Sequence, residues 1–475
     1  MSGMVRSGLA GSMAVCASGV LLFSLAAESR PLPARQVIAI TEVNVIDVEQ
    51  GRSLGPRTVL IDNGHISAIT SPRAAAIPPG ARRIPGRGKF LIPGLIDMHV
   101  HLFNLSSKRP PNDWSLPLYL ANGVTGVREM RADAESMVLV NQWRNQIDEG
   151  ALSAPRIVAA GIAVQGVSPL DAARQVAAAA EAGADFIKVF SEIPASHWRA
   201  VLNTANARAL AVAGHVPAGV PIAAAADAGQ RSNEHLMQAY EACSGDEKRW
   251  LAPRAELRSD ALAKMRDEQE APVLAAFDQA ACTRAARALA DTRQAQVPTL
   301  VLADEDSMQA AGKPRNDWRW RFLRADERTR WEKFLTVYTK EDAALAKARW
   351  PVARKIVRTF DQAGVTILAG TDAPMPGVYP GFSLHEEMGL LVAAGLAPAA
   401  ALRAATIAPA RFLDIANESG SIAVGKRADL ILLDADPLKN IYNTRKIRAV
   451  VFDGRVLLRP ALDGLLREVA AANPR

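Results

Sequence analysis

Six residues that can bind metal ions stand at or near the ends of short hydrophobic runs in this chain. A hydrophobic run of four to eight residues, bounded by polar residues, is typical of a buried strand. Two of the six are separated by one residue, so on a single strand their side chains would point to the same side. The pattern requires a fold in which several strand ends meet in one place. The six residues are His99, His101, Lys188, His215, His235 and Asp372.

Lys188 is the most unusual of these residues, because it lies within the apolar run 186–190. An isolated ammonium group in a buried strand would carry a large desolvation cost. The lysine becomes compatible with such a strand if carbon dioxide has converted it to an anionic carbamate that bridges two metal ions. An unmodified lysine, paired with a carboxylate beside a single metal ion, is the alternative.

Eight strand-like runs alternate with mostly alanine-rich helical stretches through the middle of the chain. This alternation predicts an α/β fold, a (β/α)8 barrel of the TIM type. Active sites of such barrels lie at the C-terminal ends of the strands, where all six residues fall. The predicted strands cover residues 95–101, 123–130, 156–164, 184–190, 211–217, 232–236, 296–302 and 365–373.

Short strands separated by turns precede and follow the predicted barrel. We assign the barrel to residues 94–415. Residues 36–93 and 416–475 have the same strand-and-turn character, with turns such as the one near Asp453. We therefore expect these two flanking segments to pair into one small β-sandwich domain.

The first 27 residues are typical of an export signal. Arg6 precedes an apolar run of small residues, and Ser24-Leu25-Ala26 resembles a signal-peptidase site. This predicts a periplasmic or secreted protein with no stable membrane insertion after cleavage. Cys243 and Cys282 would remain in the mature chain, either as one disulfide or as two free buried thiols.

The charge of the chain does not by itself indicate a macromolecular partner. The net charge is +7 and the sequence pI is about 9.4. Basic runs with interleaved aromatic residues and nucleic-acid-binding motifs are lacking in the sequence, so we assign the excess charge to solvated surface and expect no nucleic-acid partner. The expected partner is a small-molecule substrate, and assembly into a homo-oligomer is left open.

Three motifs relate the chain to a known family. They are the opening motif FLIPGLIDMHVH at 90–101, the late segment 395–409 and the closing motif GSIAVGKRADL at 420–430. Together with the six residues, they resemble the metal-dependent amidohydrolase superfamily. The resemblance is to the branch that holds prolidase-type dipeptidases, relatives of imidazolonepropionase and ochratoxin amidases.

The resemblance implies a role for each candidate site residue. His99, His101 and Asp372 would hold one metal ion, and His215 and His235 the other, with carboxylated Lys188 as a bridge. Two zinc ions suit this set of imidazole and carboxylate ligands, with manganese or cobalt as substitutes. Asp372 would also be the catalytic group, accepting a proton from the attacking hydroxide and passing it to the leaving amine.

Two further residues are candidates for binding the substrate. Arg128 lies near the end of the second predicted strand, where it could pair with a carboxylate. His385 follows the eighth predicted strand, and the resembling branch often has a histidine there. Packing of His385 within a helix is the alternative.

These residues predict an exported two-metal hydrolase that cleaves an amide bond in a dipeptide or an N-acyl amino acid. The same centre could instead hydrolyse a cyclic amide, a lactone or an organophosphate ester. A metal-binding protein without catalytic activity is a third hypothesis, which the retention of Asp372 beside all the metal ligands disfavours.

Overall fold

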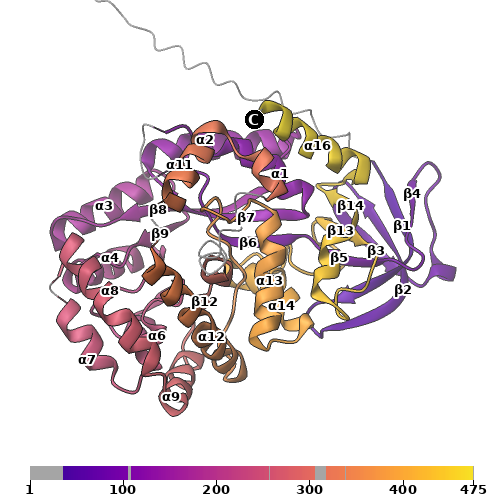
Figure 1. Ribbon diagram of the computed structural model, residues 1–475. Coiled ribbons are helices and arrows are strands. Elements are labelled where there is room, and N and C mark those ends of the chain that lie inside the picture. The colour runs from indigo at the N-terminus through magenta and orange to yellow at the C-terminus, as the bar shows by residue number, and fades with distance from the viewer. Residues whose placement is uncertain (1–35, 105–108, 256, 305–316, 337–338, 474–475) are drawn as a thin grey trace, which may run out of the picture.

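The chain forms a helix-covered barrel with a second β-sheet at one side (Figure 1). The computed structural model describes residues 36–104, 109–255, 257–304, 317–336 and 339–473. The predicted signal peptide, residues 1–27, lies outside this range. Within the described part of the chain, every helix is too short or too polar to cross a membrane.

The barrel sheet consists of seven parallel strands, and each neighbouring pair follows chain order. Most of their residues are buried, as expected for parallel strands covered by helices. The strands are β6 (Leu95–Val100), β7 (Val124–Ala132), β8 (Arg156–Val164), β9 (Phe186–Val189), β10 (Ala211–Gly214), β11 (Gln230–Glu234) and β12 (Ala295–Val297).

The segment 365–373 nearly closes the barrel between β6 and β12. It forms single parallel bridges on both sides, from Ala373 to Val100 and from Ile367 to Gln296. The expected eighth strand is therefore present as an extended closing segment with isolated bridges, and the α/β barrel prediction is confirmed.

Helices surround the barrel on the outside, and their ends follow from local capping. The Asp133 side chain accepts a hydrogen bond from the Ser136 amide at 2.8 Å where the second helix begins, and Gly150 ends that helix at a φ of 76°. The outer helices are α1 (Leu116–Ala121), α2 (Ala134–Glu149), α3 (Pro169–Glu181), α4 (Ala195–Asn206), α5 (Ile222–Asp227), α9 (Gln279–Ala290), α12 (Lys340–Gln362), α13 (Phe382–Ala394), α14 (Pro398–Ala404) and α15 (Ile407–Phe412).

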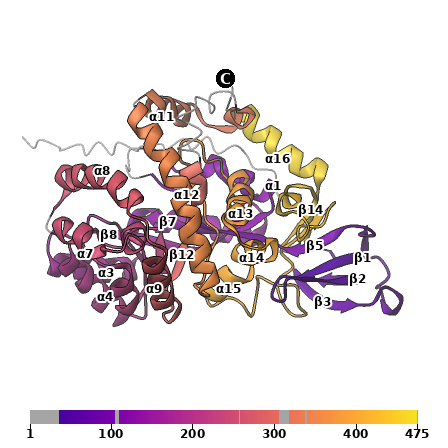
Figure 2. The ribbon, with the colours of Figure 1, turned by 60° about the horizontal axis from the view of Figure 1, so that its bottom comes forward.

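Further helices follow β11 and β12 and cover one end of the barrel. In Figure 2, α8 and α11 lie on the upper side, and α12 runs down from α11 along the barrel. Trp331 of α11 is fully buried, with its ring centroid 5.1 Å from that of Tyr379, so it packs this cover. The covering elements are α6 (Ala239–Ala242), α7 (Glu247–Leu251), η3 (Ala252–Arg254), α8 (Ser259–Ala275), η5 (Trp318–Phe322) and α11 (Ala325–Thr336).

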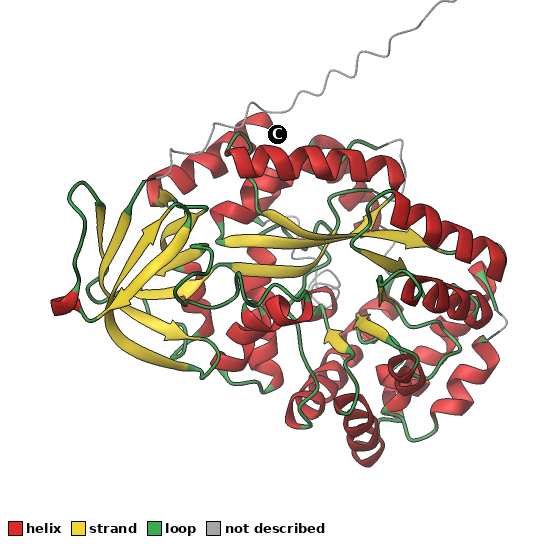
Figure 3. Ribbon diagram, turned by 180° about the vertical axis from the view of Figure 1, so that it is seen from behind, coloured by secondary structure: helices red, strands yellow, loops and turns green. Residues whose placement is uncertain are grey.

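The N- and C-terminal segments form the second sheet, set apart from the barrel strands (Figure 3). Its eight strands belong to one mixed hydrogen-bonded sheet, in which C-terminal β13 pairs with N-terminal β5. The strands are β1 (Ile38–Asp47), β2 (Arg52–Asp62), β3 (His65–Thr70), β4 (Arg82–Pro85), β5 (Phe90–Pro93), β13 (Leu430–Leu433), β14 (Ile447–Phe452) and β15 (Arg455–Leu458). The remaining elements are η1 (Pro72–Ala74), η2 (Asp113–Ser115), η6 (Ile441–Arg445) and α16 (Arg459–Ala472).

Gly94 connects the two sheets, because it is the one residue between β5 and β6. A Cβ atom at this position would lie 2.0 Å from Thr125 Oγ1, closer than any side chain tolerates. Glycine therefore allows the backbone to pass from the outer sheet directly into the first barrel strand, which carries His99 and leads to His101.

A disulfide joins Cys243, at the end of α6, to Cys282 of α9. The two cysteines are 39 positions apart in the sequence. The bond therefore connects the helical cover to the outer layer of the barrel.

Removing this disulfide should destabilise the protein without changing the barrel. For a closed loop with a sequence separation of 39 residues, chain-entropy estimates give a loss of about 4 kcal/mol in the free energy of unfolding. The doubly substituted variant Cys243→Ala/Cys282→Ala should unfold at lower denaturant concentration, as measured by circular dichroism. The reduced wild-type protein should match it. Equal stability of the oxidised wild type and the variant would contradict this role.

Candidate metal centre

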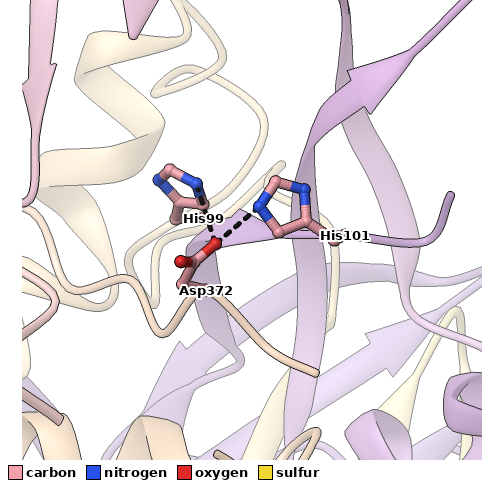
Figure 4. A group of neighbouring side chains, drawn as sticks. All are labelled: His99, His101 and Asp372. Atoms are coloured by element: carbon pink, nitrogen blue, oxygen red, sulfur yellow. Dashed lines mark ion pairs between the residues drawn. The ribbon is translucent and has the colours of Figure 1, made fainter. Parts of the chain in front are cut away.

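Three candidate ligands meet at the open end of the barrel (Figure 4). The Nε2 atom of His101 lies 2.5 Å from Asp372 Oδ1, and the Nε2 atom of His99 lies 3.3 Å from the same oxygen. All three side chains are buried, and their ligand atoms lie within 4.8 Å of one another. This is a group that could hold one metal ion.

Backbone hydrogen bonds fix these residues at the strand ends. The Asp372 amide donates to the His99 carbonyl at 2.7 Å, and the His101 amide donates to the Ala373 carbonyl at 2.8 Å. Asp372 also adopts a φ of 67°, a left-handed conformation that is uncommon for residues other than glycine and often occurs at functional sites. The closing segment thus carries Asp372 across the barrel to the two histidines.

The other candidate ligands lie beside this group. The His235 ring centroid is 4.7 Å from that of His99 and 5.0 Å from that of His215. Lys188, on β9, is fully buried, and its Nζ atom has no hydrogen-bond partner in the part of the chain that the structure describes. The His215 amide bonds to the carbonyl of Val189, the residue after Lys188. The structure therefore brings all six predicted metal-ligand residues to one end of the barrel, in two adjoining groups.

Hydrogen bonds orient two of the imidazole rings. His99 Nδ1 lies 2.8 Å from Glu234 Oε2, and His235 Nδ1 lies 2.7 Å from Thr299 Oγ1. Such partners hold a histidine ring so that its other nitrogen can bind a metal ion. Glu234 directly precedes the predicted ligand His235, so the sequence alone could have indicated Glu234 as part of the site. The sequence around Thr299 has no feature that would have indicated its role.

Several buried polar atoms at this site lack a hydrogen-bond partner within the described residues. They include His101 Nδ1, His215 Nδ1 and Lys188 Nζ. Unpaired buried polar atoms are unfavourable and call for a partner such as water or an ion. The imidazole and carboxylate donors, together with these unpaired atoms, fit divalent metal ions.

Burial favours the neutral, metal-binding form of three of the imidazoles, those of His101, His215 and His235. It lowers the pKa of His101 and of His235 to about 3, and lowers that of His215 as well. Burial also lowers the pKa of Lys188 to about 8. Burial opposes ionisation of Asp372, but His101 and His99 outweigh it and hold the pKa of this carboxyl well below its usual value.

Arg128 lies inside the barrel and is fully buried. Its Nη2 atom donates to Glu234 Oε1 at 3.0 Å, and its Nε atom donates to the Met98 carbonyl at 2.6 Å. The guanidinium carbon also lies 5.5 Å from the centre of the Phe186 ring. Arg128 was predicted to bind the substrate, but in the structure its side chain is paired with protein groups in the barrel interior.

His385 also has protein partners for both ring nitrogens. Its Nδ1 atom lies 2.9 Å from Thr444 Oγ1, and its Nε2 atom lies 2.9 Å from the Asn122 carbonyl. The residue is buried in α13. This placement matches helix packing, the alternative considered for His385, and the structure does not bring it to the metal-ligand residues.

A cavity of about 430 Å³ opens beside the metal-ligand residues. His215, His235 and Asp372 line its inner end, and residues of α8 and α12 line its other side. Three of its lining residues are arginines, namely Arg254, Arg266 and Arg349. The cavity connects the candidate metal centre with the helical cover, as expected for a substrate site.

The comparisons with known proteins agree with this architecture. Residues 338–457 match the Amidohydrolase family. A segment of 111 residues is 38% identical to an imidazolonepropionase of Geobacillus sp. strain WCH70, and it covers 22% of this chain and 25% of that protein. The chain thus spans about a quarter of the length of this curated relative.

Solved structures share the fold over most of the chain. A Xaa-Pro dipeptidase with bound methionine in its active site has a TM-score of 0.63 and 20% identity, covering 89% of this chain and 100% of that chain. The ochratoxinase of A. niger has a TM-score of 0.59 and 19% identity, covering 90% and 97%. The comparisons therefore show an amidohydrolase-family segment at residues 338–457, a distant sequence relative over part of its length, and a fold shared with these solved structures over most of the chain.

The contact between Thr299 and His235 predicts a specific effect on metal binding. Thr299→Val preserves the side-chain shape but removes the hydroxyl that orients the ring. Loss of such a partner typically weakens metal affinity about 10- to 100-fold. Competition with a chromogenic chelator would measure the change.

Thr329→Val is a matched control, because Thr329 is exposed on α11 and its hydroxyl bonds only to the Ala325 carbonyl. This variant should bind metal as the wild type does. Unchanged affinity in Thr299→Val would show that the hydroxyl does not position His235.

Proposed function

We propose that this protein is an exported, two-metal amidohydrolase that cleaves an amide bond in a small carboxylate-bearing substrate. A dipeptide or an N-acyl amino acid is the expected substrate. The observation that carries the proposal is the group of His99, His101 and Asp372, which could hold a metal ion at the open end of a barrel with the amidohydrolase fold.

The donor set supports a pair of divalent ions, with zinc as the proposed metal. His99, His101 and Asp372 would hold one ion, and His215, His235 and Lys188 would complete the site for the other. When bound, the metal would polarise the scissile carbonyl and lower the pKa of a water molecule. Asp372 lines the cavity where the substrate would lie.

The proton transfers fall to Asp372. Its carboxylate would accept a proton as the oxygen of water adds to the carbonyl carbon, and would donate that proton to the leaving nitrogen as the C–N bond breaks. The depressed pKa favours the ionised form that must act first as the base. The products are a carboxylic acid and an amine.

Lys188 supports a carbamate bridge through its location. Its buried Nζ atom has no hydrogen-bond partner among the described residues, and lies 5.3 Å from the centre of the Phe190 ring, which also contacts the His215 ring. Addition of the unprotonated amine to carbon dioxide forms a carbamate and releases one proton. The carbamate would turn an unpaired buried donor into an anionic ligand.

Export is part of the proposal. The signal-like segment at residues 1–27 supports it, and a disulfide between Cys243 and Cys282 is the kind of bond that persists in an oxidising compartment. A periplasmic or secreted hydrolase would meet small peptides and acylated amino acids there. Assembly of the chain into a homo-oligomer remains compatible with these observations.

Release of free amine from a panel of dipeptides and N-acyl amino acids tests the proposed reaction. The zinc-loaded protein should produce amine, and prior treatment with a chelator should abolish the activity. Asp372→Asn should reduce kcat at least about 100-fold, since general acid–base catalysis contributes factors of this size. Wild-type kcat in this variant would assign the proton transfers to another group. Failure to cleave any amide in the panel would contradict the proposed function.

A further inference from the structure

Arg131 is an arginine without an acceptor at the open end of the barrel. It lies one residue before the end of β7, on the side of the barrel where the metal-ligand residues gather. Its side chain is partly exposed, and its buried Nε atom has no hydrogen-bond partner. Within the described residues, no carboxylate lies within 4 Å of its guanidinium group. An arginine carries five donors in a planar fork suited to carboxylates, so this arrangement leaves its binding capacity unused.

An aromatic contact holds Arg131 next to the site. Its guanidinium carbon lies 5.7 Å from the centre of the Phe190 ring, and Lys188 Nζ lies 5.3 Å from the same ring. The His215 ring meets Phe190 edge-on at 5.3 Å. Phe190 therefore places Arg131 beside the group that contains Lys188 and His215.

Arg131 also interacts electrostatically with both groups of metal-ligand residues. Burial lowers the pKa of Arg131, whereas the nearby Asp372 and Glu129 raise it and Arg330 lowers it. In turn, the charge of Arg131 contributes to the lowered pKa values of His101 and Lys188. These effects agree with the contact to Phe190, which puts the guanidinium in the neighbourhood of Lys188 and His215.

The other arginines near the site differ from Arg131, because their side chains have acceptors. Arg254 donates to Glu241 at 2.6 Å, Arg349 donates to Glu270 at 2.6 Å, and Arg330 donates to Glu327 at 2.7 Å. Arg266 has Ser191 Oγ as an acceptor at 3.0 Å and Glu192 at 3.9 Å. Arg131 is the one of these five arginines that has no acceptor for its side chain among the described residues.

We infer that Arg131 is the specificity-determining residue that binds the free carboxylate of the substrate. Its two terminal nitrogens would donate to the two carboxylate oxygens in a charge-assisted pair. This inference rests on the proposed function, and it adds the residue that selects free acids over neutral amides or esters. No bond is made or broken at Arg131, so its contribution is to binding and orientation.

The test compares one substrate with its C-terminal amide. The substrate is the best free acid from the amine-release panel. In Arg131→Met, KM for the free acid should rise about 10- to 100-fold, the size expected when a hydrogen-bonded charge pair is lost. KM for the amide should change little, so the preference for the acid should collapse. Arg131→Lys should retain part of that preference, because a lysine supplies charge without the fork.

The variant should fold, because removing Arg131 leaves no buried carboxylate without its partner. Lys264→Met is a matched control: it removes one positive charge from the exposed side of α8. This control should keep the wild-type ratio of acid to amide. A general structural defect in Arg131→Met would affect both substrates equally and would leave the ratio unchanged.

Two outcomes would overturn the inference. An unchanged acid-to-amide ratio in Arg131→Met would remove Arg131 from substrate recognition. Loss of the preference in Arg266→Met instead would place the carboxylate site on the helical cover. In either case the proposed hydrolase would stand, because the wild type would still release amine.

If no amide is hydrolysed, isothermal titration calorimetry can still test the inference. It would measure the affinity of the protein for N-acetyl-L-alanine and for N-acetyl-L-alaninamide. Tighter binding of the acid by the wild-type protein, lost in Arg131→Met, would support the anion site even if the proposed reaction fails. Equal binding of both compounds by the wild type would refute the site without reference to catalysis.

Discussion

The ion pair between Arg128 and Glu234 inside the barrel is the interaction on which the candidate metal centre depends. Glu234 accepts hydrogen bonds from Arg128 and Ser232 and also contacts the His99 ring. Arg128 in turn donates to the Met98 carbonyl, next to His99. A buried carboxylate without such partners would be protonated, and the charge of Arg128 is the main interaction that keeps the pKa of Glu234 low despite its burial. One buried pair therefore links β6, β7 and β11 and orients a metal-ligand candidate.

The same pairing explains why the open end of the barrel can concentrate so many ionisable groups. Charges in a protein interior are tolerated when they are paired and hydrogen-bonded. The charges of Arg128 and Glu234 inside the barrel satisfy each other, whereas Lys188 Nζ and Arg131 Nε lack a hydrogen-bond partner among the described residues. The groups left without a partner are those that could take part in binding an ion or a charged substrate.

The barrel could be predicted from the sequence, because each buried strand is a local hydrophobic run that ends at polar residues. Such runs can be recognised without knowledge of the tertiary contacts. The predicted strand 156–164 coincides with β8, and most other predicted ends lie within a few residues of the observed ones. The predicted strand 296–302 is too long, because β12 ends at Val297. The ligand candidates were found for the same reason, since residues at the C-terminal ends of parallel strands must converge. The closing segment 365–373 was predicted as a strand from its composition. In the structure it forms only isolated bridges with its neighbours among the described residues.

The residue inferred to bind the substrate carboxylate, Arg131, could not be predicted in the same way. β7 changes its pairing register with β8 between Val127 and Arg128 and again between Glu129 and Ala132. Such irregularities alter which side chains face the interior, so alternation could not distinguish Arg128 from Arg131. The partners of His385 come from residues 122 and 444, contacts that only the folded chain reveals.

Anomalous X-ray scattering at the zinc edge, from crystals of the zinc-loaded protein, tests the two-metal account most directly. The account predicts two peaks per chain, roughly 3.5–4 Å apart as in other two-metal sites. One peak should lie among His99, His101 and Asp372, and the other beside His215 and His235. Electron density for a carboxyl group should extend from Lys188 Nζ between them. A single peak at the first position, with Lys188 unmodified, would contradict the account.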